Sequence, residues 1–267
     1  MAGVASAKEI SFEEIEMDKQ PLARGGFGKV HKCKWLEYPG VIKVIRADSE
    51  KDIEDIIREA ELTLRLSHPN VIRLFGITRV KPTKLGIVME EAEHGSLDKW
   101  IGQMRGDKLM KIALGIIDGL TYVHSQKVIH RDIKPKNIFM FGTDDDMIPK
   151  IADFGVSKLI QTTVMTHTRV GQDLYMAPEV RVNTKYSFTA DIYSLAMTLF
   201  EMFNEQLLLH SSYEVKKFLL NVQSGKTEGI PRSCKVPEDL RRIIERGFDQ
   251  NPQQRPSLSE YRSTIQG

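Results

Sequence analysis

Cysteine is scarce in this chain, whose 267 residues include only Cys33 and Cys234. The two lie far apart in the sequence and neither has the spacing of a metal-ligand set, so a framework of disulfide bonds is excluded. We therefore expect two reduced thiols and a cytoplasmic protein.

Long apolar runs are also missing. The most apolar segment, residues 192–209, is interrupted by Glu201, Asn204 and Glu205. This pattern is too polar for a membrane span and predicts a buried helix. The first residues contain no apolar stretch of signal-peptide length, so we expect neither a secretory leader nor a membrane-bound protein.

No charge of one sign predominates. The 38 basic and 36 acidic residues leave a formal net charge of +2, so no overall field attracts nucleic acid or an anionic membrane. The pairs Lys216-Lys217 and Arg241-Arg242 are typical of solvated helix faces. Charged residues at 28% are ordinary for a folded enzyme, and the length allows one large domain or two lobes.

The first third of the chain is rich in short β patterns. They surround one helical pattern, in which Ser49 and Asp52 have the spacing of a capping box. The predicted strands comprise residues 30–34, 41–45, 71–78 and 85–89. We place a small antiparallel β lobe with one main helix at residues 12–92.

After Gly95-Ser96 the pattern becomes mainly helical. The predicted elements are helices near 109–120 and 193–203 and a hairpin of 138–140 with 149–152. We place a larger, mainly helical lobe at residues 93–264, within one domain of residues 1–267. The expected fold class is therefore α+β.

The most informative residues are the run HRDIKPKN, which begins at His130, and DFG, which begins at Asp153. Asp132 offers a carboxylate that can take a proton from a hydroxyl, and Lys134 offers a cation for a phosphate. Asn137 and Asp153 offer oxygens suited to Mg²⁺. Both runs resemble the catalytic and metal-binding segments of the eukaryotic protein kinase family.

The resemblance covers residues 12–261 and implies the bilobal protein kinase fold. HRDIKPKN, GxxxYMAPE and NPxxRPS together look most like the tyrosine-kinase-like branch. The implied reaction transfers the γ-phosphoryl group of ATP to serine or threonine hydroxyls of proteins, with Mg²⁺. The implied partners are a protein substrate and an activating partner or dimer.

A nucleotide site follows from the same resemblance. The turn at residues 22–30 aligns with the family's glycine-rich loop, although alone it would indicate a plain hairpin, and Val41-Ile42-Lys43 aligns with the strand that presents a lysine to phosphates. The residues implied around ATP are Leu22, Ala23, Gly25, Gly28, Val30, Val41, Lys43, Met89, Glu90, Ala92, Phe139 and Asp153.

Lys43 needs a carboxylate that orients it. Glu59 lies nine residues before His68, which is the family's spacing, so the resemblance assigns this role to Glu59. Glu61 competes, but it lies about 200° around the helix and would face away. The implied catalytic residues are Asp132, Lys134, Lys43 and Glu59.

Residues 153–179 correspond to the family's activation segment, and Glu179 at its end is expected to pair with Arg255. Because Arg131 offers a cation to a phosphate in this segment, we expect phosphorylation at Thr168, with Thr166 as a neighbouring regulatory residue.

Two residues depart from the family pattern. Gln172 stands where serine/threonine kinases usually have a threonine that bridges the catalytic aspartate and lysine, which weakens the expected preference for serine and threonine over tyrosine. Thr63 stands where an apolar side chain usually packs onto Leu74 and Phe154. We expect an active state that is marginal without phosphorylation or a partner.

Two other functions fit parts of the sequence. A pseudokinase would keep the fold and bind nucleotide without transfer, but the set Lys43, Glu59, Asp132, Asn137 and Asp153 is complete and favours an enzyme. A small-molecule kinase is disfavoured, because such enzymes generally lack the long segment that ends in Ala-Pro-Glu.

Overall fold

The computed structural model describes residues 9–25, 28–154, 173–183, 186–226 and 229–267. Within these ranges the chain forms two compact units. The smaller unit consists of the residues up to Glu93 together with Asp153 and Phe154. The larger unit consists of residues 94–152 and the described residues from Asp173 onward.

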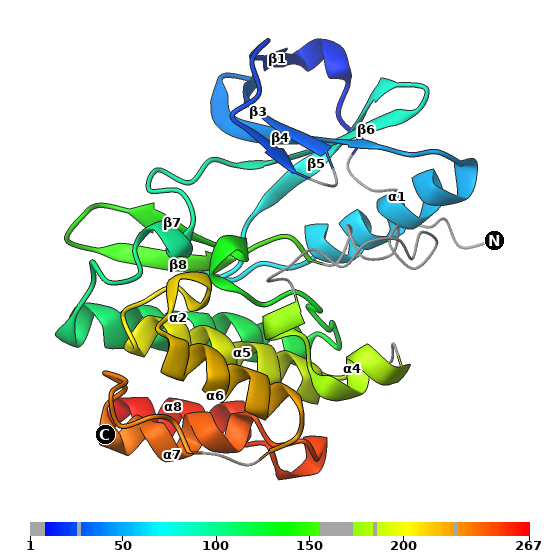
Figure 1. The fold of residues 1–267 in the computed structure, drawn as a ribbon. Coiled ribbons are helices and arrows are strands. Elements are labelled where there is room, and N and C mark those ends of the chain that lie inside the picture. The colour runs from blue at the N-terminus through cyan, green and yellow to red at the C-terminus, as the bar shows by residue number, and fades with distance from the viewer. Residues whose placement is uncertain (1–8, 26–27, 155–172, 184–185, 227–228) are drawn as a thin grey trace. The chain divides into compact units, whose positions relative to one another are not determined.

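The smaller unit is built on an antiparallel sheet with the strand order β1-β3-β4-β6-β5, and β2 pairs with β3 outside this order (Figure 1). Its elements are η1 (Phe12–Glu14), β1 (Ile15–Met17), β2 (Ala23–Gly25), β3 (Gly28–Trp35), β4 (Tyr38–Arg46), α1 (Glu50–Leu64), β5 (Leu74–Lys81) and β6 (Lys84–Glu90). Helix α1 packs against β5. The predicted capping box of Ser49 and Asp52 is confirmed, since each side chain accepts a hydrogen bond from the other's backbone N–H.

Strand β5 begins three residues later than the pattern predicts. Val71 and Ile72 are buried, but the backbone N–H of Val71 donates to the carbonyl of His68 in a turn after Pro69. These apolar residues are therefore core residues that precede the strand, which an apolar pattern alone does not distinguish.

The larger unit is mainly helical, as predicted. Its elements are η2 (Leu97–Lys99), α2 (Gly106–Ser125), η3 (Pro135–Asn137), β7 (Ile138–Gly142), β8 (Met147–Ile151), η4 (Asp173–Tyr175), α4 (Pro178–Asn183), α5 (Phe188–Phe203), η5 (Leu208–His210), α6 (Tyr213–Gln223), α7 (Glu238–Gly247), η6 (Pro252–Gln254) and α8 (Leu258–Gln266). Helix α2 packs against β8, α5 and α8, and α5 packs against α7. The predicted β7–β8 hairpin and the α+β class are confirmed.

Helix α5 is the core of this unit, because every residue from Ala190 to Phe203 is buried. It begins at Phe188, earlier than predicted, since the Ser187 side chain accepts a hydrogen bond from the backbone N–H of Ala190 and caps the first turn. None of the helices that the structure describes has both the length and the apolar character needed to cross a membrane.

Candidate active site

A buried aspartate on α5 fixes the segment that begins with His130. Asp191 is fully buried, and its carboxylate accepts hydrogen bonds of 2.8 Å from the backbone N–H groups of His130 and Arg131. Nε2 of His124 lies 2.9 Å from the same carboxylate. These bonds hold Arg131 at a φ of 71°, in the left-handed region that residues other than glycine rarely adopt. Asp191 was not among the predicted site residues; the signal for it in the sequence is an acidic residue in the first turn of an otherwise apolar helix.

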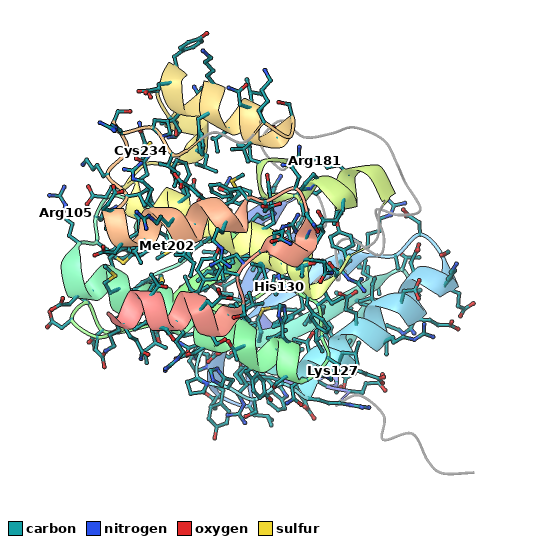
Figure 2. The ribbon with its side chains drawn as sticks, turned by 90° about the horizontal axis from the view of Figure 1, so that it is seen from below. Arg105, Lys127, His130, Arg181, Met202 and Cys234 are labelled. Atoms are coloured by element: carbon teal, nitrogen blue, oxygen red, sulfur yellow. The ribbon has the colours of Figure 1, made fainter. Side chains whose placement is uncertain are left out.

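His130 lies in the interior of the larger unit (Figure 2), where it is fully buried. Its Nδ1 accepts a hydrogen bond from the backbone N–H of Asp132, so its Nε2 carries the proton and donates to the carbonyl of Ala152, 2.9 Å away. Both ring nitrogens are therefore engaged in holding the backbone.

Asp132 is oriented by two side chains of its own segment. Its Oδ2 accepts hydrogen bonds of 2.7 Å from Nζ of Lys134 and from Nδ2 of Asn137. The same amide nitrogen of Asn137 reaches the backbone carbonyl of Asp132 at 2.8 Å. These donors fix the orientation of the Asp132 carboxylate, so the arrangement presents a positioned base.

In the smaller unit, Lys43 forms its ion pair with Asp153. The distance from Nζ to Oδ1 is 2.7 Å, and the side chains are 12% and 32% exposed. Glu59, the carboxylate expected to orient Lys43, lies half-buried on α1. The role of Glu59 as the orienting carboxylate stays a prediction.

The register of the sheet places the predicted nucleotide residues on one face. Val30 pairs with Lys43 across β3 and β4, and Val41 pairs with Met89 across β4 and β6. Because residues two apart on a strand share a face, these four side chains lie on the same side of the sheet. Their apolar members can cover a nucleobase while Lys43 reaches a phosphate.

Gly28, the first residue of β3, lies close to the backbone of β4. Its φ is 152°, and a Cβ there would lie 2.1 Å from the carbonyl oxygen of Val44. Only glycine fits this position. On the neighbouring strand β2, Ala23 pairs with Val30 and Gly25 pairs with Gly28.

The remaining predicted nucleotide residues lie in different segments, three in the smaller unit and Phe139 in the larger one. Leu22 is 59% exposed just before β2. Glu90 ends β6, where its side chain accepts a 2.8 Å hydrogen bond from the backbone N–H of Arg73. Ala92 follows it and is half-buried, and Phe139 is a half-buried residue of β7 in the larger unit.

The donor atoms of Asn137 and Asp153 suit Mg²⁺. Because Asn137 uses its amide nitrogen for Asp132, its Oδ1 is the atom left for a cation, and Asp153 contributes carboxylate oxygens. Mg²⁺ prefers oxygen ligands of these kinds. Asn137 and Asp153 each therefore offer oxygens of the kind that the implied metal binds.

The predicted regulatory residues are only partly visible. Thr166, Thr168 and Gln172 lie outside the described residues. Arg131 is described, and its guanidinium lies 5.8 Å from the centre of the Tyr186 ring.

The predicted pairing of Glu179 with Arg255 is confirmed. Both nitrogens of the Arg255 fork donate to the Glu179 carboxylate at 2.8 Å, and one of them also donates to the carbonyl of Thr189. The Arg255 side chain is fully buried. This pair ties α4 to the start of α5.

Comparison with known proteins gives the family. The sequence matches the protein kinase domain over residues 17–264. The chain belongs to this family. The predicted family is thus confirmed, and the geometry around Asp132, Lys43 and Asp153 can be assigned to a kinase domain.

Several relatives have similar sequences. Mitogen-activated protein kinase kinase kinase 10 of Xenopus laevis is 32% identical over 266 residues, which cover 94% of this chain and 26% of the relative. Serine/threonine-protein kinase VIK of Arabidopsis thaliana is also 32% identical over 266 residues, covering 94% of this chain and 58% of the relative. The chain therefore spans less than two thirds of these relatives. Their names are consistent with the tyrosine-kinase-like branch.

Proposed function

We propose that this kinase domain transfers the γ-phosphoryl group of ATP to serine or threonine hydroxyls of proteins. The observation that carries the proposal is the Asp132 carboxylate, oriented by Lys134 and Asn137 on a segment fixed by buried Asp191. Relatives named as serine/threonine kinases support the choice of acceptor.

Each polar residue has a distinct task in this reaction. Asp132 accepts the proton of the acceptor hydroxyl, and Lys134 stabilises the negative charge that develops on the transferred group. Lys43 supplies a cation for the other phosphates. Mg²⁺, when held through Asn137 and Asp153, supplies neutralisation of charge on the phosphate oxygens.

The nucleotide is proposed to use two kinds of contact. Val30, Val41 and Met89 supply the apolar face for adenine, and the backbone around Glu90 and Ala92 supplies polar groups for its edge. The glycine turn supplies backbone N–H groups for phosphate oxygens. Phe139 adds a further apolar surface.

Incubation with labelled ATP and a generic serine/threonine acceptor tests the proposal. We expect transfer by the natural chain and a loss of about 10²- to 10⁴-fold in Asp132→Asn, because the variant lacks the base. Thermal stabilisation by nucleotide should survive in this variant. Stabilisation of the natural chain without any transfer would instead favour a pseudokinase.

Regulation by phosphorylation is part of the proposal. Arg131 is held by Asp191 in a fixed backbone conformation, so its guanidinium can serve as a receptor for a phosphate on Thr168. We expect Thr168→Ala, purified in the same way as the natural chain, to have a lower kcat/KM. Full kcat/KM in this variant contradicts the role of Thr168.

We also propose a cytoplasmic location. Cys33 and Cys234 are both buried and neither is in a disulfide, as is usual in a reducing compartment. The partner in this setting is a protein substrate, and a further activating partner or a dimer would favour the active state.

A further inference from the structure

Glu201 is a buried carboxylate that the proposed mechanism does not use. It is one of the residues that interrupt the apolar segment of α5, and it is only 2% exposed. Its Oε2 accepts a 2.5 Å hydrogen bond from the hydroxyl of Tyr175, and its Oε1 accepts one of 2.8 Å from the backbone N–H of Leu208. One side chain therefore joins α5 to η4 and to η5.

Tyr175 is held by α5 through its backbone as well. The hydroxyl of Ser194 donates to the carbonyl of Tyr175 at 2.7 Å. Ser194 and Glu201 are seven residues apart, so they lie on the same face of the helix, two turns from each other. The next residue is also held, because Arg181 donates to the carbonyl of Met176 at 2.8 Å. The segment after η4 is thus positioned by side chains of α5 and α4.

The surroundings of Glu201 make its charge sensitive to pH near neutrality. Burial raises the pKa of Glu201 to about 7 and is the largest effect, whereas the hydrogen bonds from Tyr175 and Leu208 lower it. Two further charged groups face this carboxylate: Asp98 of η2 raises its pKa and Lys136 of η3 lowers it. Burial and the nearby Glu201 also raise the pKa of Tyr175, so its hydroxyl stays a donor.

The strength of the Tyr175 bond therefore depends on the charge of Glu201. The hydrogen bond from Tyr175 lowers the pKa of Glu201. By thermodynamic linkage, ionisation of Glu201 must then strengthen that hydrogen bond by the free energy that corresponds to the pKa change. A hydrogen bond to a carboxylate is roughly twice as strong as one between neutral groups. Tyr175 is consequently held more tightly when Glu201 is ionised.

We propose that Glu201 is a proton-controlled positioning residue, whose ionised carboxylate holds Tyr175 and the following segment in the arrangement that receives the acceptor peptide. Lys136, which acts on Glu201, belongs to the same run as Asp132, so this cluster lies beside the segment that carries the base. The inference rests on the proposed function, because acceptor binding is measured through phosphoryl transfer.

The first test measures KM and kcat for one serine acceptor peptide between pH 6 and pH 8. In the natural chain, KM should rise about fivefold toward pH 6, with a smaller change in kcat. Glu201→Gln and Tyr175→Phe should have a raised KM at pH 8 and a flatter profile. The matched control is Glu205→Gln, because the hydrogen bond from Lys235 lowers the pKa of Glu205 and keeps it ionised throughout. A Glu201→Gln profile that follows the natural one overturns the inference.

The second test uses no catalysis and follows unfolding against pH in the same proteins. A raised pKa means that native Glu201 keeps a proton which the unfolded chain releases, between the ordinary value of 4.5 and about 7. The natural chain should therefore lose stability relative to Glu201→Gln as pH rises through this window. In Tyr175→Phe the pH range over which stability falls should extend to higher pH, because the hydrogen bond from Tyr175 that lowers the pKa of Glu201 is missing.

The two tests separate the two proposals. Absence of transfer at every pH, with the expected unfolding profiles, overturns the proposed function and leaves the linkage between Glu201 and Tyr175 supported. Transfer with parallel unfolding profiles for the natural chain and Glu201→Gln overturns the inference alone.

Discussion

The two units hold their polar functional residues in different ways. In the larger unit, Asp132 receives two hydrogen bonds from its own segment, which buried Asp191 fixes through the backbone. In the smaller unit, Lys43 and Asp153 share one ion pair that is partly exposed. The groups proposed to activate the acceptor are therefore anchored to a buried carboxylate, whereas those proposed for the phosphates are joined by one partly exposed ion pair.

The largest effect on stability is expected from Asp191→Asn. An amide nitrogen in place of one carboxylate oxygen faces a buried N–H of His130 or Arg131, and an unsatisfied donor of this kind lowers the free energy of unfolding by about 1.5–3 kcal/mol. The hydrogen bonds to Asp191 that hold Arg131 in its left-handed backbone conformation are weakened as well, so kcat/KM should fall. Urea unfolding and steady-state kinetics measure both effects.

Asp118→Asn is the matched control for this variant. Asp118 is an aspartate of α2 whose ion pair with Arg262 is partly exposed, and such pairs contribute about 0–1 kcal/mol. If Asp191→Asn is no less stable than Asp118→Asn, the claim that a buried carboxylate organises the larger unit is wrong.

Asp153→Asn should affect stability less, by about 1 kcal/mol or less without nucleotide, because its ion pair with Lys43 is partly exposed. The difference in unfolding free energy between Asp153→Asn and Asp191→Asn therefore compares directly how the two units hold their aspartates. The variant should lose the part of the thermal stabilisation by ATP that depends on added Mg²⁺. Unchanged stabilisation by ATP and Mg²⁺ together would remove Asp153 from the metal site.

Local patterns in the sequence predicted the local parts of the fold. The capping box of Ser49 and Asp52 and the β7–β8 hairpin depend on residues close together in the chain, and both are present. The predicted start of β5 was wrong, because the apolar residues Val71 and Ile72 are buried before the strand begins. Burial alone does not define the backbone conformation.

Contacts between distant residues explain what the sequence did not predict about the site. Asp191 lies about sixty residues after the segment it holds, and no local spacing connects them. The motif residues Lys43 and Asp153 were both predicted, but not that they pair with each other. Composition identified Glu201 as a polar interruption, and only the packing around it shows its bond to Tyr175.

The smallest effect is expected from Thr63→Leu, which tests the expectation that Thr63 leaves the active state marginal without phosphorylation or a partner. Thr63 is buried on α1, and its hydroxyl donates to the carbonyl of Glu59 one turn earlier. Its polar group is therefore satisfied within the helix, and α1 itself lies against β5. A leucine adds apolar contact there, so basal kcat/KM of the unphosphorylated chain should rise severalfold.

Thr63→Val separates the two parts of this change, because it removes the hydroxyl without lengthening the side chain. We expect a smaller gain in basal kcat/KM for valine than for leucine, since the added contact is smaller. Equal activity in the natural chain and in both variants would mean that packing at this position does not limit the active state. The expectation that Thr63 makes the active state marginal would then be wrong.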